Sequence, residues 1–327
     1  MKDYVEEFSK HLIEGLEIGS KSAFNNTNKS FDNIFICGLG GSGIGGKLVS
    51  QLYWDKIEQP VTISNDYFIP KSVGKNTLTI ACSYSGNTEE TLEAMEKAAA
   101  AGSEIAVVSS GGKIIDIAKE KGYNHIQIPE GYPPRAALGY SFVELQFILH
   151  NYGIISSDFI NEVKSGVQLI QDNEADIKAE AKKLADALHG KTPVLYASPL
   201  FESVLIRFRQ QLNENAKQLC WHHVFPELNH NELVGWASGT NDLSVIIFRT
   251  EEDYYRTEKR IDISIEQMKK FTSHITEVHA KGKTRIERYI YLIHLTDLVS
   301  VYLADNKKVD PIEIDVIIHL KSELSKI

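Results

Sequence analysis

Short apolar runs alternate with amphipathic stretches along most of the chain. Apolar side chains recur at helical spacing across residues 3–24 and predict a helix, and the polar run NNTNKS at 25–30 predicts a loop. The β-branched run Ile34–Cys37 ends in glycines and indicates a buried strand. Similar runs predict three more strands, at Val61–Ser64, Leu78–Ala81 and Ile105–Val108. Strong helix formers fill residues 88–101, so the sequence predicts βαβ units with a mostly parallel sheet.

The second half of the chain repeats this order. A Tyr-Pro-Pro break precedes a helix predicted from Arg135 to about Tyr152, and a charged helical pair is predicted over 157–188. The remaining predicted elements are a strand at 194–197, a helix over Phe201–Leu219, a strand at 243–248 and two helices at 282–303 and 311–325. The segments IFICGLGGSG and VLYASPLFES form a weak internal repeat. We therefore expect two similar α/β domains, at 1–153 and 191–327, joined by a helical connector at 154–190.

Composition and charge narrow the class of protein. The 327 residues are 43% apolar and 24% charged, enough for a packed core in two or three domains, or in one large domain. A net charge of −9 disfavours broad binding to nucleic acid or an anionic membrane, although a local pocket could hold a small anion. Cys37, Cys82 and Cys220 form no CxxC pair, so we expect neither a structural zinc site nor a disulfide framework. The sequence has no signal-peptide core and no apolar run of about 20 residues, and a cytoplasmic location is expected.

The glycine-rich segment Gly38–Gly46 lies between a predicted strand and a predicted helix. Its first residues, GLGGSG, match the dinucleotide-binding pattern G-x-G-x-x-G, and Asp66 stands about where a ribose-binding acid would lie. The segment also fits the start of a nucleoside-triphosphate loop, but Leu48 stands where that loop needs Ser or Thr for magnesium. The alternative is a tight turn that needs glycine for its backbone angles. The functional interpretations share an anion held by backbone N–H groups at a helix N-terminus.

A run of hydroxyl groups follows the strand predicted at Leu78–Ala81. Ser83, Ser85 and Thr88, with Gly86 among them, come directly before the helix-forming segment. Hydroxyls and helix N–H groups can bind a phosphate dianion without a cationic side chain. One hydroxyl would suffice to cap the helix, so three hydroxyls and a glycine favour a phosphate site over capping alone.

The pattern Ser83-x-Ser85-Gly86-x-Thr88 after a strand resembles the phosphate-binding motif of the sugar-isomerase (SIS) domain. Further segments, in order, are similar to the bifunctional phosphoglucose/phosphomannose isomerase family: GLGGSGIGG at 38–46, PPRAALGYSF at 133–142, NENAK at 213–217, ELNHNELVGW at 227–236, and Asp310-Pro311 with Leu320-Lys321. The resemblance implies two SIS domains, each a mostly parallel sheet flanked by helices in a flavodoxin-like αβα sandwich. It also implies hexose 6-phosphate substrates and a homodimer with active sites at the subunit interface. The isomerase chemistry requires no metal or organic cofactor.

The resemblance also implies roles for single residues. The substrate phosphate would be held by a set of small residues: Gly40, Gly41, Ser42, Ser83, Ser85 and Thr88. Glu214, which lies opposite the apolar stripe of its predicted helix, would move a proton between C1 and C2 through a cis-enediol. Arg135 would stabilise the enediolate, and its predicted place in the first turn of a helix, where a cation opposes the dipole, is a further hint of function. His230, from the adjoining subunit, and Lys321 would open the sugar ring.

The end of the chain departs from the family pattern. Bifunctional members carry a threonine about two turns before the ring-opening lysine, where glucose-only isomerases carry glutamine; this chain has Ile314 there and no Ser, Thr or Gln from Val301 to Leu320. Lys307 and Lys308 are rival candidates for the role of Lys321. Three other functions stay open: a non-catalytic sugar-phosphate sensor, an isomerase of another phosphosugar and, on the G-x-G-x-x-G match alone, a nicotinamide-dependent dehydrogenase.

Overall fold

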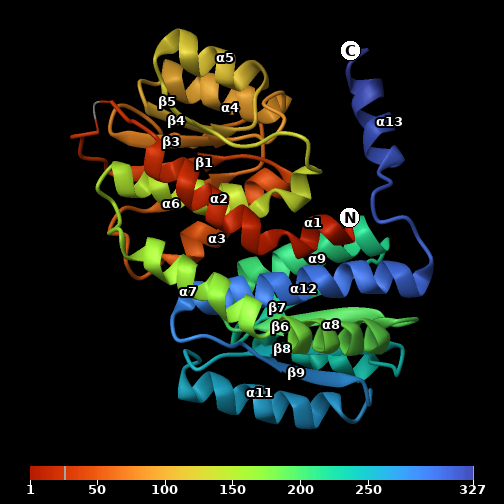
Figure 1. Ribbon diagram of the computed structural model, residues 1–327. Helices are drawn as coiled ribbons and strands as arrows, with labels where there is room; N and C mark the ends of the chain where they lie inside the picture. The colour runs from red at the N-terminus through yellow and green to blue at the C-terminus, as the bar shows by residue number, and fades with distance from the viewer. Residues whose placement is uncertain (26, 327) are drawn as a thin grey trace. The chain divides into compact units, whose positions relative to one another are not determined.

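The computed structural model describes residues 1–25 and 27–326, which fold into two compact units (Figure 1). The five-stranded unit comprises Glu6–Asn173 and Lys281–Leu292. The four-stranded unit comprises Met1–Val5, Glu174–Ala280 and residues 293–326. Each unit contains one sheet, in which every strand runs parallel to its neighbours. The predicted α/β class with two parallel sheets flanked by helices is therefore confirmed.

The sheet of the five-stranded unit has the strand order β2-β1-β3-β4-β5. Its strands are β1 (Asn33–Cys37), β2 (Val61–Ser64), β3 (Thr77–Cys82), β4 (Glu104–Ser109) and β5 (Asn124–Gln127). Figure 1 shows α4 (Glu89–Ala100) and α5 (Gly112–Lys121) on one face, and α3 (Gly40–Leu52) and α6 (Leu138–Asn151) on the other. Because side chains alternate along a strand, Phe35 and Cys37 pack with α4 and α5, whereas Ile36 contacts Gly46 of α3.

Helix α2 (Phe8–Lys21) packs on α6 through glycines. A Cβ atom at Gly19 would lie 2.0 Å from the Phe147 ring, and one at Gly139 would lie 2.7 Å from the Cβ of His11. The absent side chains let the two helix backbones approach closely. This contact holds α2 and α6 together. The unit also contains α7 (Asp158–Asp172).

The sheet of the four-stranded unit has the strand order β7-β6-β8-β9. Its strands are β6 (Thr192–Ala197), β7 (Trp221–Val224), β8 (Leu243–Arg249) and β9 (Ile275–His279). One face buries Tyr196, Phe225 and Ile247 together with residues of α11 (Tyr255–Met268). The unit's other helices are α1 (Lys2–Glu6), α8 (Glu174–Leu188), α9 (Glu202–Ala216), α10 (Glu232–Gly235), α13 (Asp315–Leu324) and the later part of α12 (Arg285–Lys307).

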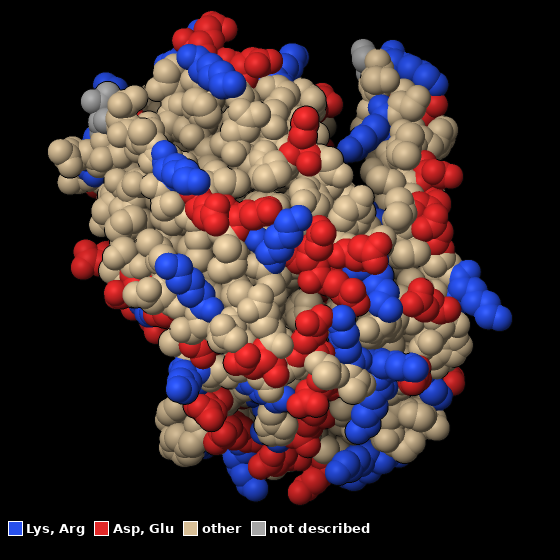
Figure 2. All heavy atoms as spheres, in the orientation of Figure 1, with Lys and Arg blue, Asp and Glu red and all other residues tan. Residues whose placement is uncertain are grey.

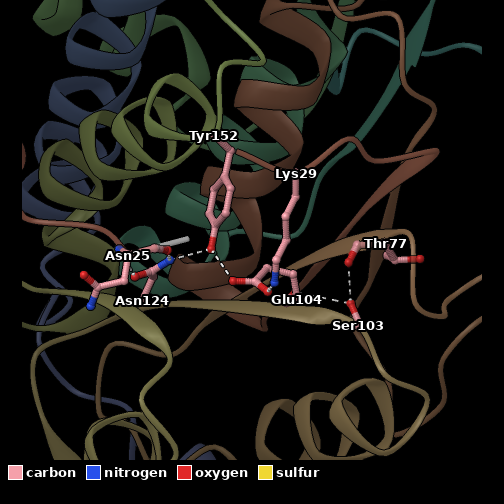
Figure 3. A network of polar contacts seen from close by, with 7 residues as sticks. All are labelled: Asn25, Lys29, Thr77, Ser103, Glu104, Asn124 and Tyr152. Carbon is pink, nitrogen blue, oxygen red and sulfur yellow. Dashed lines mark hydrogen bonds and ion pairs between the residues drawn. The ribbon is translucent and has the colours of Figure 1, made fainter. Parts of the chain in front are cut away.

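A closed polar network lies at the amino ends of β3, β4 and β5 (Figure 3). The Tyr152 hydroxyl donates to the Glu104 carboxylate at 2.9 Å and accepts from the Asn124 side chain at 2.7 Å. Lys29 pairs with the same carboxylate. The Asn124 amide also exchanges two hydrogen bonds of 2.9 Å with the backbone of Asn25. The network ties the segment between α2 and β1 to the amino edge of the sheet, opposite the carboxyl ends of the strands.

The predicted strands all lie within observed strands, but the glycine-rich segment differs from the prediction. The sequence predicts a turn through Gly46, whereas α3 already begins at Gly40. Tertiary contacts explain the difference, because a Cβ at Gly43 would lie 2.4 Å from the Gly38 carbonyl oxygen and one at Gly46 would lie 2.8 Å from Ile36. Close packing against β1 therefore overrides the low helix propensity of glycine.

Several helix boundaries also differ from the prediction. The helix predicted over 3–24 is divided into α1 and α2. Arg135 lies in a 3₁₀ turn (Pro134–Ala136) and not in the first turn of α6, so the helix-dipole argument for it was wrong. Helix α9 ends at Ala216 and not at Leu219, which is 82% exposed. The pattern predicts none of α5, β5, α11 and β9.

The surface carries charges of both signs. On the face drawn in Figure 2, Lys and Arg side chains lie among Asp and Glu side chains. This mixture gives the face no broad basic area of the kind that binds a nucleic-acid backbone. Within residues 1–25 and 27–326, none of the helices is long and apolar enough to cross a membrane.

Candidate active site

The carboxyl ends of β1 and β3 bring the two predicted phosphate-binding segments together. The two strands pair in parallel, with Cys37 opposite Ala81, so the segments that follow them start at the same edge of the sheet. After β1 the chain enters α3 at Gly40, and after β3 it forms the Ser83–Thr88 loop before α4. The Tyr84 backbone N–H donates to the Ser42 hydroxyl oxygen at 2.9 Å. Ser42 and the Ser83–Thr88 loop are thus in direct contact.

The hydroxyl groups of the Ser83–Thr88 loop face one another. The Ser83 and Thr88 hydroxyls share a hydrogen bond of 2.9 Å, and the Gly86 N–H donates to Ser83 Oγ at 3.1 Å. The Asn87 N–H donates to Ser85 Oγ at 3.3 Å. Thr88 is the N-cap residue of α4, yet its side chain accepts no capping hydrogen bond. Capping alone therefore does not account for this hydroxyl, which lies at the positive end of the helix dipole.

Two glycines are required by the backbone at this edge. Gly86 has a left-handed φ of 70°, and a Cβ there would lie 1.7 Å from the Gly111 carbonyl oxygen. A Cβ at Gly41 would lie 2.8 Å from the Pro134 carbonyl oxygen and 3.1 Å from the Cα of Arg135. The start of α3 thus lies directly against the 3₁₀ turn that carries Arg135.

Tyr84 links the Ser83–Thr88 loop to the segment before Arg135. Its hydroxyl donates to the Pro129 carbonyl at 3.0 Å and accepts from the Tyr132 backbone N–H at 2.9 Å. Arg135 itself is 3% exposed. The structure therefore assembles the predicted phosphate residues and Arg135 at one edge of one sheet. The role of Tyr84 is not predicted from the sequence, since only the serines and the threonine match the motif.

The two thiols beside this edge are buried. Cys37 and Cys82 are the last residues of β1 and β3, and both are fully buried. Burial raises the pKa of the Cys37 thiol to about 12 and raises that of Cys82 as well. In the described part of the chain, no group of three or more His, Cys, Asp or Glu side chains is arranged to hold a metal ion.

Glu214 lies in the four-stranded unit, in the last turn of α9. Its side chain is half-buried, and the residue beside it, Asn215, is fully buried and donates to the Ser300 hydroxyl at 2.9 Å. About two turns earlier, Arg207 pairs with Asp297 of α12 at 2.6 Å, and both are buried. These contacts fix α9 against α12. A carboxylate at a helix C-terminus opposes the dipole, which costs about 0.3–1 kcal/mol and marks Glu214 as a residue kept for another reason.

His230 is exposed at the end of a 3₁₀ turn (Glu227–His230), and its neighbours in the chain are held firmly. Asn229 donates to the Ser264 hydroxyl and Asn231 donates to the Glu227 carboxylate, both at 2.8 Å. The next residue, Glu232, accepts hydrogen bonds from the Tyr196 hydroxyl and from Trp221 Nε1. The ring of His230 is therefore presented to solvent from a fixed backbone.

Lys321 lies on α13 and is exposed, as are most residues of this helix. The two rival lysines lie at the end of α12. The Lys307 ammonium is already bound to the Lys217 carbonyl at 3.0 Å and to the Gln218 side chain at 2.9 Å, and burial lowers its pKa. Lys308 is exposed and has a left-handed φ of 57°. Of the three lysines, only Lys321 lies on the helix that carries the family's closing segment.

Comparison with known proteins finds relatives of this chain. Residues 177–324 match the family described as the bacterial phospho-glucose isomerase C-terminal SIS domain. The chain is 36% identical to the bifunctional phosphoglucose/phosphomannose isomerase of Caldicellulosiruptor bescii over 100% of this chain and 99% of that one. It is also 36% identical, over 75% of this chain and 74% of the relative, to the D-glucosamine-6-phosphate 4-epimerase of Sulfolobus acidocaldarius.

A solved structure shows the same fold at low sequence identity. The C-terminal domain of glucosamine-fructose-6-phosphate aminotransferase from Francisella tularensis aligns with a TM-score of 0.74 and 14% identity, and covers 95% of this chain and 99% of that one. The full-length similarity to the Caldicellulosiruptor protein, together with the SIS-domain match, is the finding that decides the family. The chain belongs to the bifunctional phosphoglucose/phosphomannose isomerase family.

Proposed function

We propose that this chain interconverts glucose 6-phosphate and fructose 6-phosphate, with mannose 6-phosphate as a second substrate. The observation that carries the proposal is the Ser83–Thr88 loop, whose paired hydroxyls lie at the start of α4 without capping it. Tyr84 of this loop binds the segment that precedes the turn with Arg135. Full-length similarity to the bifunctional isomerases supports the choice of substrate.

The five-stranded unit supplies the groups that hold charge. The substrate phosphate accepts hydrogen bonds from the hydroxyls of Ser42, Ser83, Ser85 and Thr88 and from N–H groups at the start of α4. Gly40 and Gly41 let the backbone approach the phosphate. The Arg135 guanidinium offsets the negative charge that develops on the sugar oxygens during reaction.

The four-stranded unit supplies the groups that move protons. His230 and Lys321 exchange protons with the ring oxygen and the anomeric hydroxyl, which opens the ring. The Glu214 carboxylate then takes the proton from C2 of the open-chain aldose and leaves a cis-enediolate. Return of the proton to C1, with transfer of the O2 hydroxyl proton to O1, gives the ketose. The proton count is unchanged over the cycle.

We further propose a homodimer in which His230 acts in the site of the partner subunit. The support is its position: the ring is exposed in the single chain, although the residues on both sides of it are fixed by hydrogen bonds. In this proposal mannose 6-phosphate is accepted without a hydroxyl at position 314, where Ile314 is the N-cap residue of α13.

The test is conversion of fructose 6-phosphate by the purified protein in the presence of a chelator, with each product measured separately. The proposal predicts both glucose 6-phosphate and mannose 6-phosphate. Glucose 6-phosphate alone would contradict the second substrate and make Ile314 the first position to substitute. Binding without turnover would favour a sensor. Conversion of glucosamine 6-phosphate at a higher rate than the hexose 6-phosphates would favour the reaction of the Sulfolobus relative.

A further inference from the structure

Lys217, the last residue of the NENAK segment, has an unusual conformation for a lysine. It ends α9 with a left-handed backbone (φ 49°, ψ 44°), and its N–H donates to the Leu212 carbonyl. A non-glycine residue rarely adopts this conformation, because its Cβ approaches the following carbonyl. The strain is local to Lys217, and the contacts of its side chain indicate the role of the residue.

The Lys217 ammonium donates three hydrogen bonds to backbone carbonyls. The acceptors are Glu214 at 2.8 Å, Asp310 at 2.7 Å and Glu313 at 2.8 Å. An ammonium has three protons, so its donor capacity is filled. The Glu214 carbonyl belongs to the last turn of α9, where carbonyls lack partners within the helix. The other two acceptors lie 93 and 96 residues further along the chain, in the segment between α12 and α13.

A second lysine reinforces the same junction. Lys307, the last residue of α12, donates to the Lys217 carbonyl at 3.0 Å and to the Gln218 side chain at 2.9 Å. Two ammonium groups thus join the ends of α9 and α12 to each other, and one of them also binds both ends of the Asp310–Glu313 segment. All of these residues belong to the four-stranded unit.

The helix that follows this junction has little packing of its own. None of the described residues of α13 is buried, and Val316, Ile318 and Leu320 are each more than half exposed. The position of Lys321 relative to Glu214 therefore depends on the Asp310–Glu313 segment more than on contacts of α13.

We propose that Lys217 is a positioning residue, which holds the Asp310–Glu313 segment, and through it Lys321 on α13, in register with Glu214. The inference rests on the roles proposed above for Glu214 and Lys321. Lys217 does not act on the substrate. Stabilising the end of α9 would need only the Glu214 carbonyl, and the two bonds to a remote segment are what a tether requires.

The test compares Lys217→Met, which keeps most of the aliphatic stem and loses the three donors, with Lys191→Met. Lys191 is the matched control, because its ammonium also donates to a backbone carbonyl in this unit, that of Asn241 at 2.8 Å, but to one only. In Lys217→Met we expect amide hydrogen exchange to accelerate in residues 310–324 and to stay unchanged in β6 and β8. We expect kcat for fructose 6-phosphate to fall roughly 100-fold, with KM changed less than about twofold, because the phosphate groups lie in the other unit. Lys217→Arg keeps the charge and should recover part of the loss.

Combining substitutions separates positioning from general destabilisation. On a Lys321→Met background, Lys217→Met should lower kcat no further, because a residue that acts through Lys321 has nothing left to position. Multiplied losses would overturn the proposal, and so would unchanged exchange in residues 310–324 together with unchanged kcat in Lys217→Met. Full turnover in both Glu214→Gln and Lys321→Met would instead reject the proposed catalytic roles, and the exchange measurement would still decide whether Lys217 tethers the segment.

Discussion

The loops after β3 and β8 occupy the same place in the two parallel sheets, yet they have opposite chemistry. Each strand pairs beside the first strand of its unit, β3 with β1 and β8 with β6. After β3, hydroxyls and glycine N–H groups bind one another and carry no negative charge. After β8, the Thr250 N–H and hydroxyl are both taken by the Asp253 carboxylate, at 2.9 and 3.2 Å.

The difference separates two contributions to anion binding: the sheet topology, which the two units share, and the loop side chains, which differ. The carboxyl edge of a parallel sheet gathers loops and helix N-termini, which favours anion binding in both units. In the four-stranded unit an internal carboxylate occupies the donors, and Glu251 and Glu252 would repel a phosphate. We infer that phosphate is bound by the five-stranded unit alone, and that the four-stranded unit contributes the side chains that transfer protons.

The largest effect expected from this division is that of Glu214→Gln. Loss of the base should lower kcat by about 10³-fold or more and leave the Kd for fructose 6-phosphate within a few-fold, since no phosphate group is changed. Steady-state kinetics and calorimetry measure the two quantities. Glu202→Gln, in the first turn of the same helix, is the control. Turnover like that of the wild type in Glu214→Gln would remove this residue from the mechanism.

Arg135→Met should have the next largest effect, roughly a 100-fold fall in kcat, because the enediolate loses its cation. Arg135→Lys should recover part of this. The guanidinium is nearly fully buried, so thermal unfolding must show that each variant is folded before its rate is interpreted. A variant that weakened binding of inorganic phosphate more than it lowered kcat would place Arg135 among the phosphate ligands instead.

A pair of threonine substitutions tests the two loops directly. Thr88→Val removes a hydroxyl that we assign to the phosphate and should weaken binding of fructose 6-phosphate about tenfold or more, the effect of losing a hydrogen bond to a charged group. Thr250→Val changes the corresponding loop of the other unit and should leave binding unchanged. Equal losses in the two variants would contradict the difference between the loops. Isothermal titration of each protein gives the answer.

The last prediction concerns stability and not turnover, and its subject is Glu144 of α6, the helix that lies on the same face of the sheet as α3. Glu144 is fully buried, and within the described residues neither carboxyl oxygen has a hydrogen-bond partner; burial raises its pKa to about 9. Its unfolded pKa is about 4.3. The folded protein therefore holds the proton more tightly, so stability is complete below about pH 4 and falls towards pH 9, by up to about 1.4 kcal/mol per pH unit.

Glu144→Gln should remove this pH dependence. Urea unfolding at pH 5, 7 and 9 should show a flatter free energy of unfolding for the variant than for the wild type. The exposed Glu120→Gln should keep the slope of the wild type. Equal slopes in all three proteins would mean that Glu144 is not held neutral by burial.

The residues explain why some of this structure could be predicted and some could not. The strands are short runs of buried β-branched residues, a pattern that periodicity detects, and the Ser83–Thr88 motif is local in sequence. The start of α3 was missed because its glycines are selected by contacts with Ile36 and Gly38, which the sequence does not reveal. The end of α9 was missed because apolar spacing continues to Leu219. In the structure the helix ends where Lys217 adopts a left-handed conformation, and the Lys217 side chain binds carbonyls more than 90 residues away, which the local pattern does not reveal.

The measurement that tests the central claim most directly is solvent labelling during turnover. Fructose 6-phosphate is incubated with the protein in D₂O and a chelator, and the hexose 6-phosphate pool is analysed by mass spectrometry as the reaction approaches equilibrium. Because the proton held on the half-buried Glu214 carboxyl can exchange with solvent before it returns to C1, transfer through an enediol predicts that deuterium accumulates in the pool over repeated turnovers. Glu214→Gln should form label and product at least about 10³-fold more slowly while still binding the sugar. A pool that reaches equilibrium without deuterium would contradict the mechanism, and labelling by Glu214→Gln at the wild-type rate would contradict the assignment of the base.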